Sequence, residues 1–387
     1  MKICWFCIPA HGHTNPTLSL VKEMTEAGHE IYYFSFNEFK EKIEKAGAKF
    51  ISCDEQEFEM EDKENAERVA KDIVFSTQLI VKTTLALDEM VNEKVKEIKP
   101  DLVVSDSVAF WGKLIAIKYK IPYVSSTTTF AFNKNSASYM NQSIWNLAKM
   151  IFTMPKANKQ LKPLQAKGYP VKNILDIIQN DNETNTIVYT SKYYQPCSDT
   201  FSEKYCFIGP SIRPVETPFE KTSDTTIFIS MGTVIKNKSF YNDCVEAFRN
   251  TNYQVIISTG KSDTPFENLP SHIQVYPFVD QMAVLSISDV FITHCGMNSA
   301  SEGLYFEVPL VLCPQTQEEE AVAIRTEELG AGIWLKRIRQ SKDILEAVNK
   351  ILADPTYKQS ASKISKSFKE CEGVKAAKAF LEGIKKE

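Results

Sequence analysis

The sequence predicts an α/β protein with two doubly wound parallel sheets, each in its own domain, that face each other across a cleft. Short apolar runs alternate with helix-like segments along the chain, which is the pattern of parallel strands and their crossover helices. At 387 residues the chain is also too long for one ordinary core. A hydrophobic fraction of 43% and a charged fraction of 24% are typical of globular proteins.

The first apolar run, residues 3–8, is predicted to be a buried strand. Asn15 is expected to cap the next helix, with Pro16 at its first position and Gly28 at its end. Further strands are expected at residues 30–36, 99–107 and 121–127. These elements would form an N-terminal domain over residues 1–210.

A stretch with prolines and little periodicity, residues 211–224, is predicted to be a linker. The alternation then restarts, and residues 225–365 are predicted to form a C-terminal domain. Its strands are expected at residues 225–232, 253–260, 273–279, 289–296 and 308–315. The charged segment 366–387 is expected to be a helix that packs back on the first domain.

Composition and missing motifs argue against several functions. A net charge of −4 without a basic block gives no sign of nucleic-acid binding. No run of eighteen apolar residues occurs, so no membrane span is predicted, and a cytoplasmic location is expected. A dinucleotide oxidoreductase or a nucleoside triphosphatase is disfavoured, because neither G-x-G-x-x-G nor the P-loop pattern is present.

No metal site is predicted. No D-x-D motif follows a strand, so a dedicated carboxylate pair for a divalent cation is lacking. The nine cysteines are scattered, and their odd number fits a reducing compartment. Cys4 and Cys7 have C-x-x-C spacing, but on a strand they would point to opposite faces, as buried thiols.

The segment FITHCGMNSASEG (residues 291–303) carries the clearest binding pattern. A strand leads through His294 and Gly296 into a helix whose free N–H groups suit a diphosphate. Asn298 and Ser299 could donate further hydrogen bonds, and Glu302, one turn on, could hold a ribose diol. A plain capped helix with a structural histidine is the alternative.

Two weaker patterns lie upstream of this segment. In YPFVDQ (residues 276–281), Phe278 could stack on a base, although an ordinary core phenylalanine in a turn explains the local pattern better. In SMGT (residues 230–233), a glycine turn would place Thr233 close to a phosphate.

The candidate catalytic pair is His13, in PAHGHTNP (residues 9–16), and Asp106. Both follow predicted strands of one sheet, so a carboxylate there could fix the imidazole tautomer and leave its other nitrogen to take a proton. His11 competes for the same role. A turn histidine and a loop-capping aspartate are the alternatives.

Taken in order, these motifs resemble a known enzyme family. PAHGHTNP, DLVVSDS, VYTSKYYQP, FIGPSI, ISMGTV, FVDQ and FITHCGMNSASEG are similar to the family 1 glycosyltransferases of GT-B fold, in the bacterial branch that includes macrolide glycosyltransferases. The resemblance covers nearly the whole chain. It implies inverting transfer of a sugar from a UDP-sugar to a small lipophilic or phenolic acceptor, such as a macrolide or flavonoid, without metal or cofactor. We also expect a monomer or weak dimer.

The resemblance also implies a role for each matching position. His13 would be the base and Asp106 its partner. Phe278, Val279 and Gln281 would bind the uracil side of the nucleotide, and Thr128 and Thr233 would lie near the phosphate or sugar. The remaining matches are the diphosphate positions His294, Gly296, Asn298 and Ser299, and the ribose carboxylate Glu302.

One departure from the family pattern concerns the sugar. Where the family has an acidic residue, Gln and, three residues later, Asn, the sequence PQTQEEEAVA (residues 314–323) puts Glu318, Glu319 and Val322. Glu319 can accept hydrogen bonds from hydroxyls but cannot donate them. A donor sugar other than glucose or a weaker grip on the sugar is therefore open, as is a register shift that brings Gln317 into the site.

The acceptor and two other functions also stay open. Several aromatic residues could line an acceptor pocket, although core packing explains them as well: Phe110, Trp111, Phe130, Phe132, Tyr139, Trp145 and Phe152. A non-catalytic sugar-nucleotide-binding protein and a sugar-nucleotide epimerase are the alternatives to a transferase.

Overall fold

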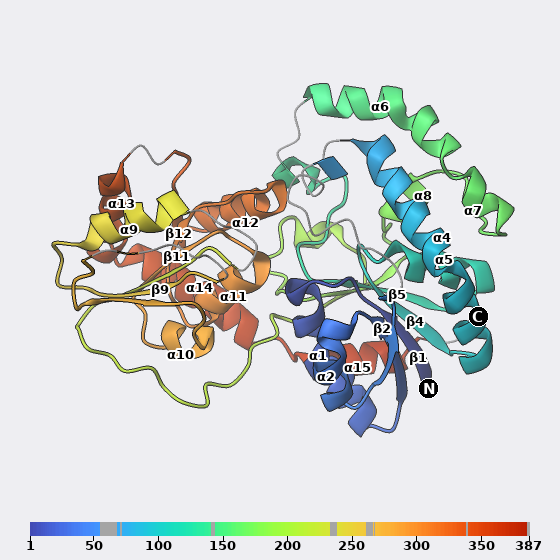
Figure 1. The fold of residues 1–387 in the computed structure, drawn as a ribbon, viewed down its shortest axis with the longest axis horizontal. Helices are drawn as coiled ribbons and strands as arrows, with labels where there is room; N and C mark the ends of the chain where they lie inside the picture. Colours follow the sequence, from blue (N-terminus) through green and yellow to red (C-terminus); the bar gives the residue numbers. More distant parts are fainter. Residues whose placement is uncertain are drawn as a thin grey trace.

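The structure is a computed structural model that describes residues 1–54, 68–69, 72–140, 144–232, 238–260, 266, 268–337 and 340–384. Within these residues the chain forms two parallel sheets, each surrounded by helices (Figure 1). We call β1 to β7 with their helices the N-terminal half, and β8 to α14 the C-terminal half.

The N-terminal sheet has seven described strands in the order β3-β2-β1-β4-β5-β6-β7. They are β1 (Lys2–Phe6), β2 (Glu30–Ser35), β3 (Lys49–Ser52), β4 (Leu102–Asp106), β5 (Tyr123–Thr127), β6 (Asn185–Val188) and β7 (Tyr205–Phe207). Their helices are α1 (His11–Glu26), η1 (Asn37–Phe39), α2 (Lys40–Lys45), α4 (Ile73–Ile98), α5 (Phe110–Tyr119), η3 (Ala137–Met140), α6 (Ile144–Lys159), α7 (Lys162–Ala166), α8 (Leu175–Ile178) and η4 (Ser198–Thr200).

The C-terminal sheet has six described strands in the order β10-β9-β8-β11-β12-β13. They are β8 (Thr226–Ser230), β9 (Gln254–Ser258), β10 (Ile273–Tyr276), β11 (Val290–Thr293), β12 (Leu310–Leu312) and β13 (Gly332–Trp334). Their helices are α9 (Lys238–Phe248), α10 (Gln281–Leu285), α11 (Met297–Tyr305), α12 (Gln317–Glu328), α13 (Ser341–Ala353) and α14 (Thr356–Lys369). This confirms the predicted class of two doubly wound parallel sheets.

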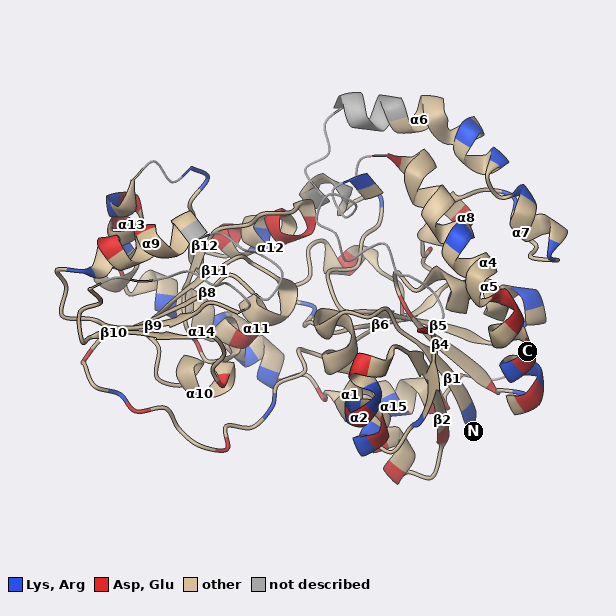
Figure 2. Ribbon diagram, in the orientation of Figure 1, with Lys and Arg blue, Asp and Glu red and all other residues tan. Residues whose placement is uncertain are grey.

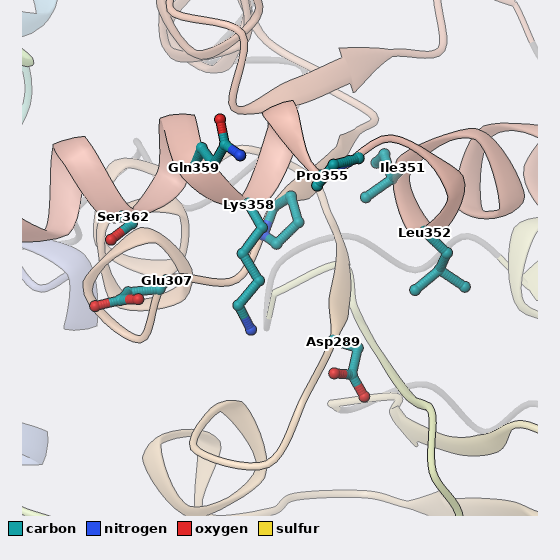
Figure 3. Close-up of a pocket in the computed structure, with 9 residues that line it drawn as sticks. Asp289, Glu307, Ile351, Leu352, Pro355, Lys358, Gln359 and Ser362 are labelled. Carbon is teal, nitrogen blue, oxygen red and sulfur yellow. The ribbon is translucent and has the colours of Figure 1, made fainter.

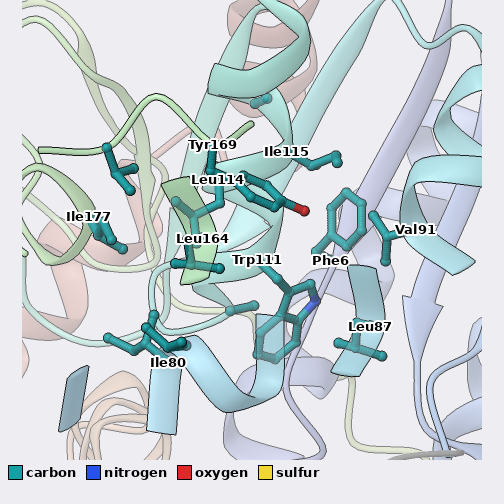
Figure 4. Packing of buried hydrophobic residues seen from close by; sticks show 14 of the residues in the cluster. Phe6, Ile80, Leu87, Val91, Trp111, Leu114, Ile115, Leu164, Tyr169 and Ile177 are labelled. Carbon is teal, nitrogen blue, oxygen red and sulfur yellow. The ribbon is translucent and has the colours of Figure 1, made fainter. Parts of the chain in front are cut away.

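Each sheet is buried on both faces, because successive side chains of a strand point in opposite directions. In β1, Cys4 and Phe6 pack under α4 and α5, whereas Ile3, Trp5 and the following Cys7 belong to the core on the other face. Figure 4 shows the first of these cores, in which Phe6 lies among side chains from the covering helices. Cys4 and Cys7 therefore occupy different cores, as their spacing predicts.

Helix α1 differs from the prediction. It begins at His11, with Ala10 at the N-cap position and no side-chain capping bond, so that Pro16 lies inside the helix. The predicted start at Asn15 and Pro16 is wrong: Pro16 is the sixth residue of the helix, and its missing N–H removes the intrahelical bond to the Gly12 carbonyl without ending the helix. As a consequence, the first turn of α1 carries His11, Gly12 and His13.

The expected single helix over residues 366–387 is also corrected. α14 ends at Lys369, and a separate helix, α15 (Val374–Glu382), follows after a break. Gly373 has a φ of 59°, a left-handed conformation that a helix cannot continue through and that glycine adopts at little cost. α15 returns to the N-terminal half, where Ala377 and Leu381 are fully buried in its core and the helix lies beside α1 (Figure 1).

Charged side chains lie mostly on helices and loops. In Figure 2 the strands of both sheets are almost entirely tan, while most of the blue and red lies on helices and loops. Among the described residues, no helix has the length and apolar character needed to cross a membrane.

Candidate active site

The candidate site residues follow the strands at which the order of each sheet reverses. In the N-terminal sheet these strands are β1, which precedes His13, and β4, which ends at Asp106. In the C-terminal sheet they are β8 and β11, and His294 follows β11. Ligands of open parallel sheets bind at such switch points, so the topology alone gives each half one binding edge.

His13 and Asp106 form a close pair at the first of these edges. Nδ1 of His13 lies 2.7 Å from Oδ2 of Asp106, whose carboxylate is fully buried. Because a carboxylate only accepts, Nδ1 carries the proton in the neutral imidazole, and Nε2 of that form keeps its lone pair. Asp106 is itself fixed by the backbone N–H of Val108, which donates to Oδ1 at 3.0 Å. The Thr128 hydroxyl lies 3.3 Å from the same imidazole nitrogen.

The surroundings of His13 raise its proton affinity. Burial lowers the pKa of His13, but the charge and the hydrogen bond of Asp106, with a smaller contribution from the charge of Glu318, raise it to about 8 overall. His11, the competing candidate, is exposed and packs edge-on against Phe39, with ring centroids 5.0 Å apart. The structure therefore brings His13, and not His11, to the carboxylate.

His294 lies between two glycines at the edge of the C-terminal sheet. A Cβ on Gly232 would come within 2.8 Å of the ring, and one on Gly296 within 2.6 Å, so neither position has room for a side chain. Burial lowers the pKa of His294 to about 4, although a hydrogen bond with the backbone of Ser230 partly opposes it. The ring is therefore neutral at neutral pH and can act there as a hydrogen-bonding group.

The predicted nucleoside-binding residues lie together near the start of α11. The Gln281 amide donates to Ser299 Oγ at 3.3 Å and also forms a short hydrogen bond with Glu302. Burial raises the pKa of Glu302 to about 7, against the opposing effects of Gln281 and of the positive charge of Arg213. The Phe278 ring is 62% exposed, and its neighbour Val279 packs partly into the core.

One hydrogen bond joins the two edges directly. Nδ2 of Asn298, in the first turn of α11, donates to the backbone carbonyl of Gly12 at 2.9 Å. Gly12 precedes His13, so the first turns of α1 and α11 meet at this point. The two groups of site residues therefore belong to one place in the molecule.

In the first turn of α12, Glu318 and Glu319 have different surroundings. Glu319 closes a capping box, in which its carboxylate accepts from the backbone N–H of Gln315 and Thr316 at 2.6 and 3.0 Å. Glu318 is exposed, and its charge acts on His13. Val322 is fully buried in the core of the C-terminal half, so the residue at the family's Asn position is an apolar core side chain without a hydrogen-bonding group.

Comparison with known proteins identifies the family to which the chain belongs. Residues 244–370 match the family described as "Erythromycin biosynthesis protein CIII-like, C-terminal domain". The chain is 34% identical over 386 residues to the uncharacterized UDP-glucosyltransferase YdhE of Bacillus subtilis (strain 168), covering 94% of this chain and 93% of YdhE. It is 31% identical to the NDP-glycosyltransferase YjiC of the same organism, covering 98% and 96% of the two chains.

The chain belongs to this glycosyltransferase family. Its fold agrees, because the structure superposes on the glycosyltransferase of kitacinnamycin with a TM-score of 0.84 at 21% identity, covering 98% of both chains. The GT-B fold implied by the sequence motifs is thereby confirmed. Of the three functions left open, the protein is the glycosyltransferase, not an auxiliary binding protein or an epimerase.

The other predicted residues lie in the core, at its margin, on the surface or outside the described part of the chain. Thr233 lies outside the described residues, as does the side chain of Trp145. Trp111 and Phe130 are core residues, respectively 5% and 1% exposed, and Figure 4 shows the Trp111 ring inside the N-terminal core. Phe152 on α6 is 85% exposed. The remaining three, Phe110, Phe132 and Tyr139, pack partly against the two cores.

A separate cavity lies at the opposite end of the C-terminal sheet. About 590 Å³ in volume, it is lined by residues that include Asp289, Glu307 and Lys358 (Figure 3). Asp289 precedes β11, whereas His294 follows it, so the length of the strand separates this cavity from the transferase site. No cluster of three or more possible metal ligands from His, Cys, Asp and Glu occurs in the described part of the transferase.

Two interactions near the candidate site were not predicted from the sequence. The first is the Gly12 carbonyl, which accepts the hydrogen bond from Asn298. Its only sign in the sequence is Pro16, four residues later, which has no N–H to donate to this carbonyl. The second is Arg213, from the linker, which lies 3.8 Å from the Asp280 carboxylate. Its positive charge acts to lower the pKa of Glu302. No local pattern marks this arginine.

Proposed function

We propose that this glycosyltransferase transfers a hexose, glucose in the first instance, from a UDP-sugar to a hydroxyl of a small lipophilic acceptor such as a macrolide or flavonoid. The observation that carries the proposal is the 2.7 Å contact between His13 and Asp106, next to the turn of α11 that fits a nucleotide. The UDP-glucosyltransferase name of the Bacillus relative supports the donor. The erythromycin-related family description supports the acceptor class.

The proposed reaction is a direct displacement. Nε2 of His13 removes the proton of the acceptor hydroxyl while its oxygen bonds to the anomeric carbon and the bond from that carbon to UDP breaks. Asp106 stabilises the imidazolium that results. Attack opposite the leaving group inverts the anomeric centre.

The leaving diphosphate would be bound without a metal. The N-terminus of α11 offers free N–H groups and the positive end of the helix dipole, and neutral His294 can add a hydrogen bond. Groups that are already oriented toward developing charge stabilise it with little reorganisation. Phe278 would stack on the uracil, and Glu302 would accept from the ribose hydroxyls.

The sugar itself would be held mainly by Glu318. Glu319 is engaged at the start of α12 and Val322 is buried, so two of the three family sugar positions are used otherwise here. We therefore expect discrimination among UDP-hexoses to be weak. Rates with UDP-glucose, UDP-galactose and UDP-N-acetylglucosamine within about tenfold of one another would agree with this expectation.

The proposed function is tested by replacing His13, the proposed base, with alanine. The protein is incubated with UDP-glucose, EDTA and a panel of macrolides and flavonoids, and UDP release is followed together with product masses. His13→Ala is expected to lower kcat/KM by about 10²–10⁴-fold, the usual contribution of a positioned base. His11→Ala, in the same turn, is the matched control and should keep the wild-type rate. Near-normal turnover of His13→Ala would exclude the mechanism, and strict dependence on an added metal would exclude the metal-free version.

A further inference from the structure

We propose that Pro16 and Asn298 act together as positioning residues that seat the turn bearing His13 against the nucleotide site. The inference rests on the proposed function. The structural basis is the hydrogen bond from Asn298 Nδ2 to the Gly12 carbonyl, 2.9 Å long, between residues that are 286 positions apart.

Pro16 makes this hydrogen bond possible. In an α-helix the carbonyl of residue 12 accepts from the N–H of residue 16. Residue 16 is proline, which has no N–H, and its ring also crowds the carbonyl four residues earlier. The Gly12 carbonyl is thus deprived of its helical donor one residue before the base. The Asn298 amide supplies a donor from the other half of the molecule.

Asn298 can serve two partners at once. Its side-chain NH₂ carries two N–H groups, and the bond to Gly12 uses one of them. The second is available to an oxygen of a diphosphate bound at the start of α11, where Asn298 lies in the first turn. A bound donor would then be connected through one amide to the backbone next to His13. The distance between the leaving group and the base would be set by this connection.

A variant of Pro16 tests the inference without touching the nucleotide. Pro16→Ala restores an N–H to residue 16, and this N–H competes with Asn298 for the Gly12 carbonyl. We expect kcat to fall about three- to tenfold, the range for one lost neutral hydrogen bond, with the Kd for UDP within twofold of wild type. Pro155→Ala is the matched control, because Pro155 also lies inside a helix, α6, in the N-terminal half. It should leave kcat unchanged.

A double-mutant cycle separates positioning from packing. Asn298→Ala is expected to lower kcat and to weaken UDP binding, since it removes both bonds of the amide. In the Asn298→Ala background, Pro16→Ala should change kcat by less than 1.5-fold, because the bond it disturbs is already gone. An equal loss in both backgrounds would mean that Pro16 acts through packing, and no loss in either would mean that the bond does not position His13. Either result overturns the inference.

A measurement that does not need turnover tests this inference separately from the proposed function. If no nucleotide sugar is consumed, the proposed function fails, but hydrogen–deuterium exchange in the peptide over residues 11–20 still reports on the contact. We expect faster exchange in Asn298→Ala than in wild type. UDP should slow exchange in wild type and leave it unchanged in Asn298→Ala. Identical exchange in all four samples would contradict the inference.

Discussion

The proton affinity of a single side chain, His13, sets the pH range of the proposed reaction. A general base acts in its deprotonated form, and the pKa of His13 is raised to about 8. Below pH 8 most of the protein therefore carries an imidazolium that cannot take a proton. We expect kcat/KM to rise with pH and to level off above about pH 8.

Glu318→Gln should move this pH profile. The carboxylate of Glu318 is one of the charges that raise the pKa of His13, so its removal lowers that pKa. The midpoint of the rising limb is expected at a lower pH than in wild type, and it is measured from kcat/KM between pH 5 and 10. Glu346→Gln, an exposed carboxylate on α13, is the control and should keep the wild-type midpoint. A profile unchanged by Glu318→Gln would show that His13 does not sense this charge.

Phe278→Ala should affect binding much more than stability. The ring is 62% exposed, so little packing is lost with it, whereas stacking of an aromatic ring on a base contributes about 1–3 kcal/mol. We expect UDP to bind about five- to 150-fold more weakly, measured by titration calorimetry. Phe152→Ala removes a ring that is 85% exposed on the other half and should leave UDP affinity unchanged. Equal affinity in Phe278→Ala would contradict the stacking role.

At the scale of single elements, the start of α12 decides which glutamate can face a sugar. Thr316 accepts from the backbone N–H of Glu319, and Glu319 accepts in return from the backbone. Thr316→Ala is expected to lower the free energy of unfolding by about 1 kcal/mol, measured by urea denaturation. Thr316→Ser keeps the hydroxyl and is the control. If both variants had wild-type stability, the cap would contribute nothing to the helix.

The elements predicted well from sequence are those with enough residues to show a pattern. The central strands β1, β2, β4 and β5 and the strands β8 to β12 lie where apolar runs predict them. β3, β6, β7 and β13 were not predicted. β10 to β12 are equally short but lie within longer apolar runs, whereas β3 (KFIS) and β6 (NTIV) contain only two apolar residues each. Helix α1 was misplaced because Asn15 and Pro16 form a typical start signal, while the actual N-cap, Ala10, carries none.

The candidate site could be predicted as a set of residues but not as contacts. The motif after β11 and the histidine after β1 indicate a nucleotide and a base, because loops at the carboxyl ends of parallel strands share an edge. Whether Glu318 or Glu319 faces outward depends on the residue at which α12 begins, which a run of three glutamates does not reveal. The bond between Asn298 and Gly12 depends on how the halves are placed, and no local pattern encodes that.

At the scale of the whole molecule, α12 ties the two halves together. Arg325 donates to the carbonyls of Tyr194 and Tyr193 at 3.0 and 2.8 Å, and the Tyr194 hydroxyl lies 2.6 Å from Thr326 Oγ1. Figure 1 shows α12 reaching from the C-terminal half toward the N-terminal half. The helix that presents Glu318 at one end is thus anchored to the opposite half at the other.

Arg325→Lys should weaken this connection. Lysine keeps the charge but lacks the planar fork that reaches both carbonyls. We expect the free energy of unfolding to fall by about 1.5–3 kcal/mol, the range for hydrogen bonds to a charged group, with the two halves unfolding in more clearly separated calorimetric transitions. Arg249→Lys is the control, since Arg249 bonds only within the C-terminal half, to Asn268 and Glu246, in the contacts described. A single transition with wild-type stability in Arg325→Lys would contradict the anchoring role.

The return of α15 to the N-terminal half has a consequence for biosynthesis. The core that Ala377 and Leu381 complete also contains Trp5 and Leu20, so a part of the chain that is made early is completed by a part that is made later. At about 5–20 residues per second, the stretch between β7 and α15 takes on the order of ten to thirty seconds to translate. Throughout that interval the apolar side chains that α15 covers stay exposed in the nascent N-terminal half. Apolar surface exposed in this way favours aggregation, and the packing of α15 removes it.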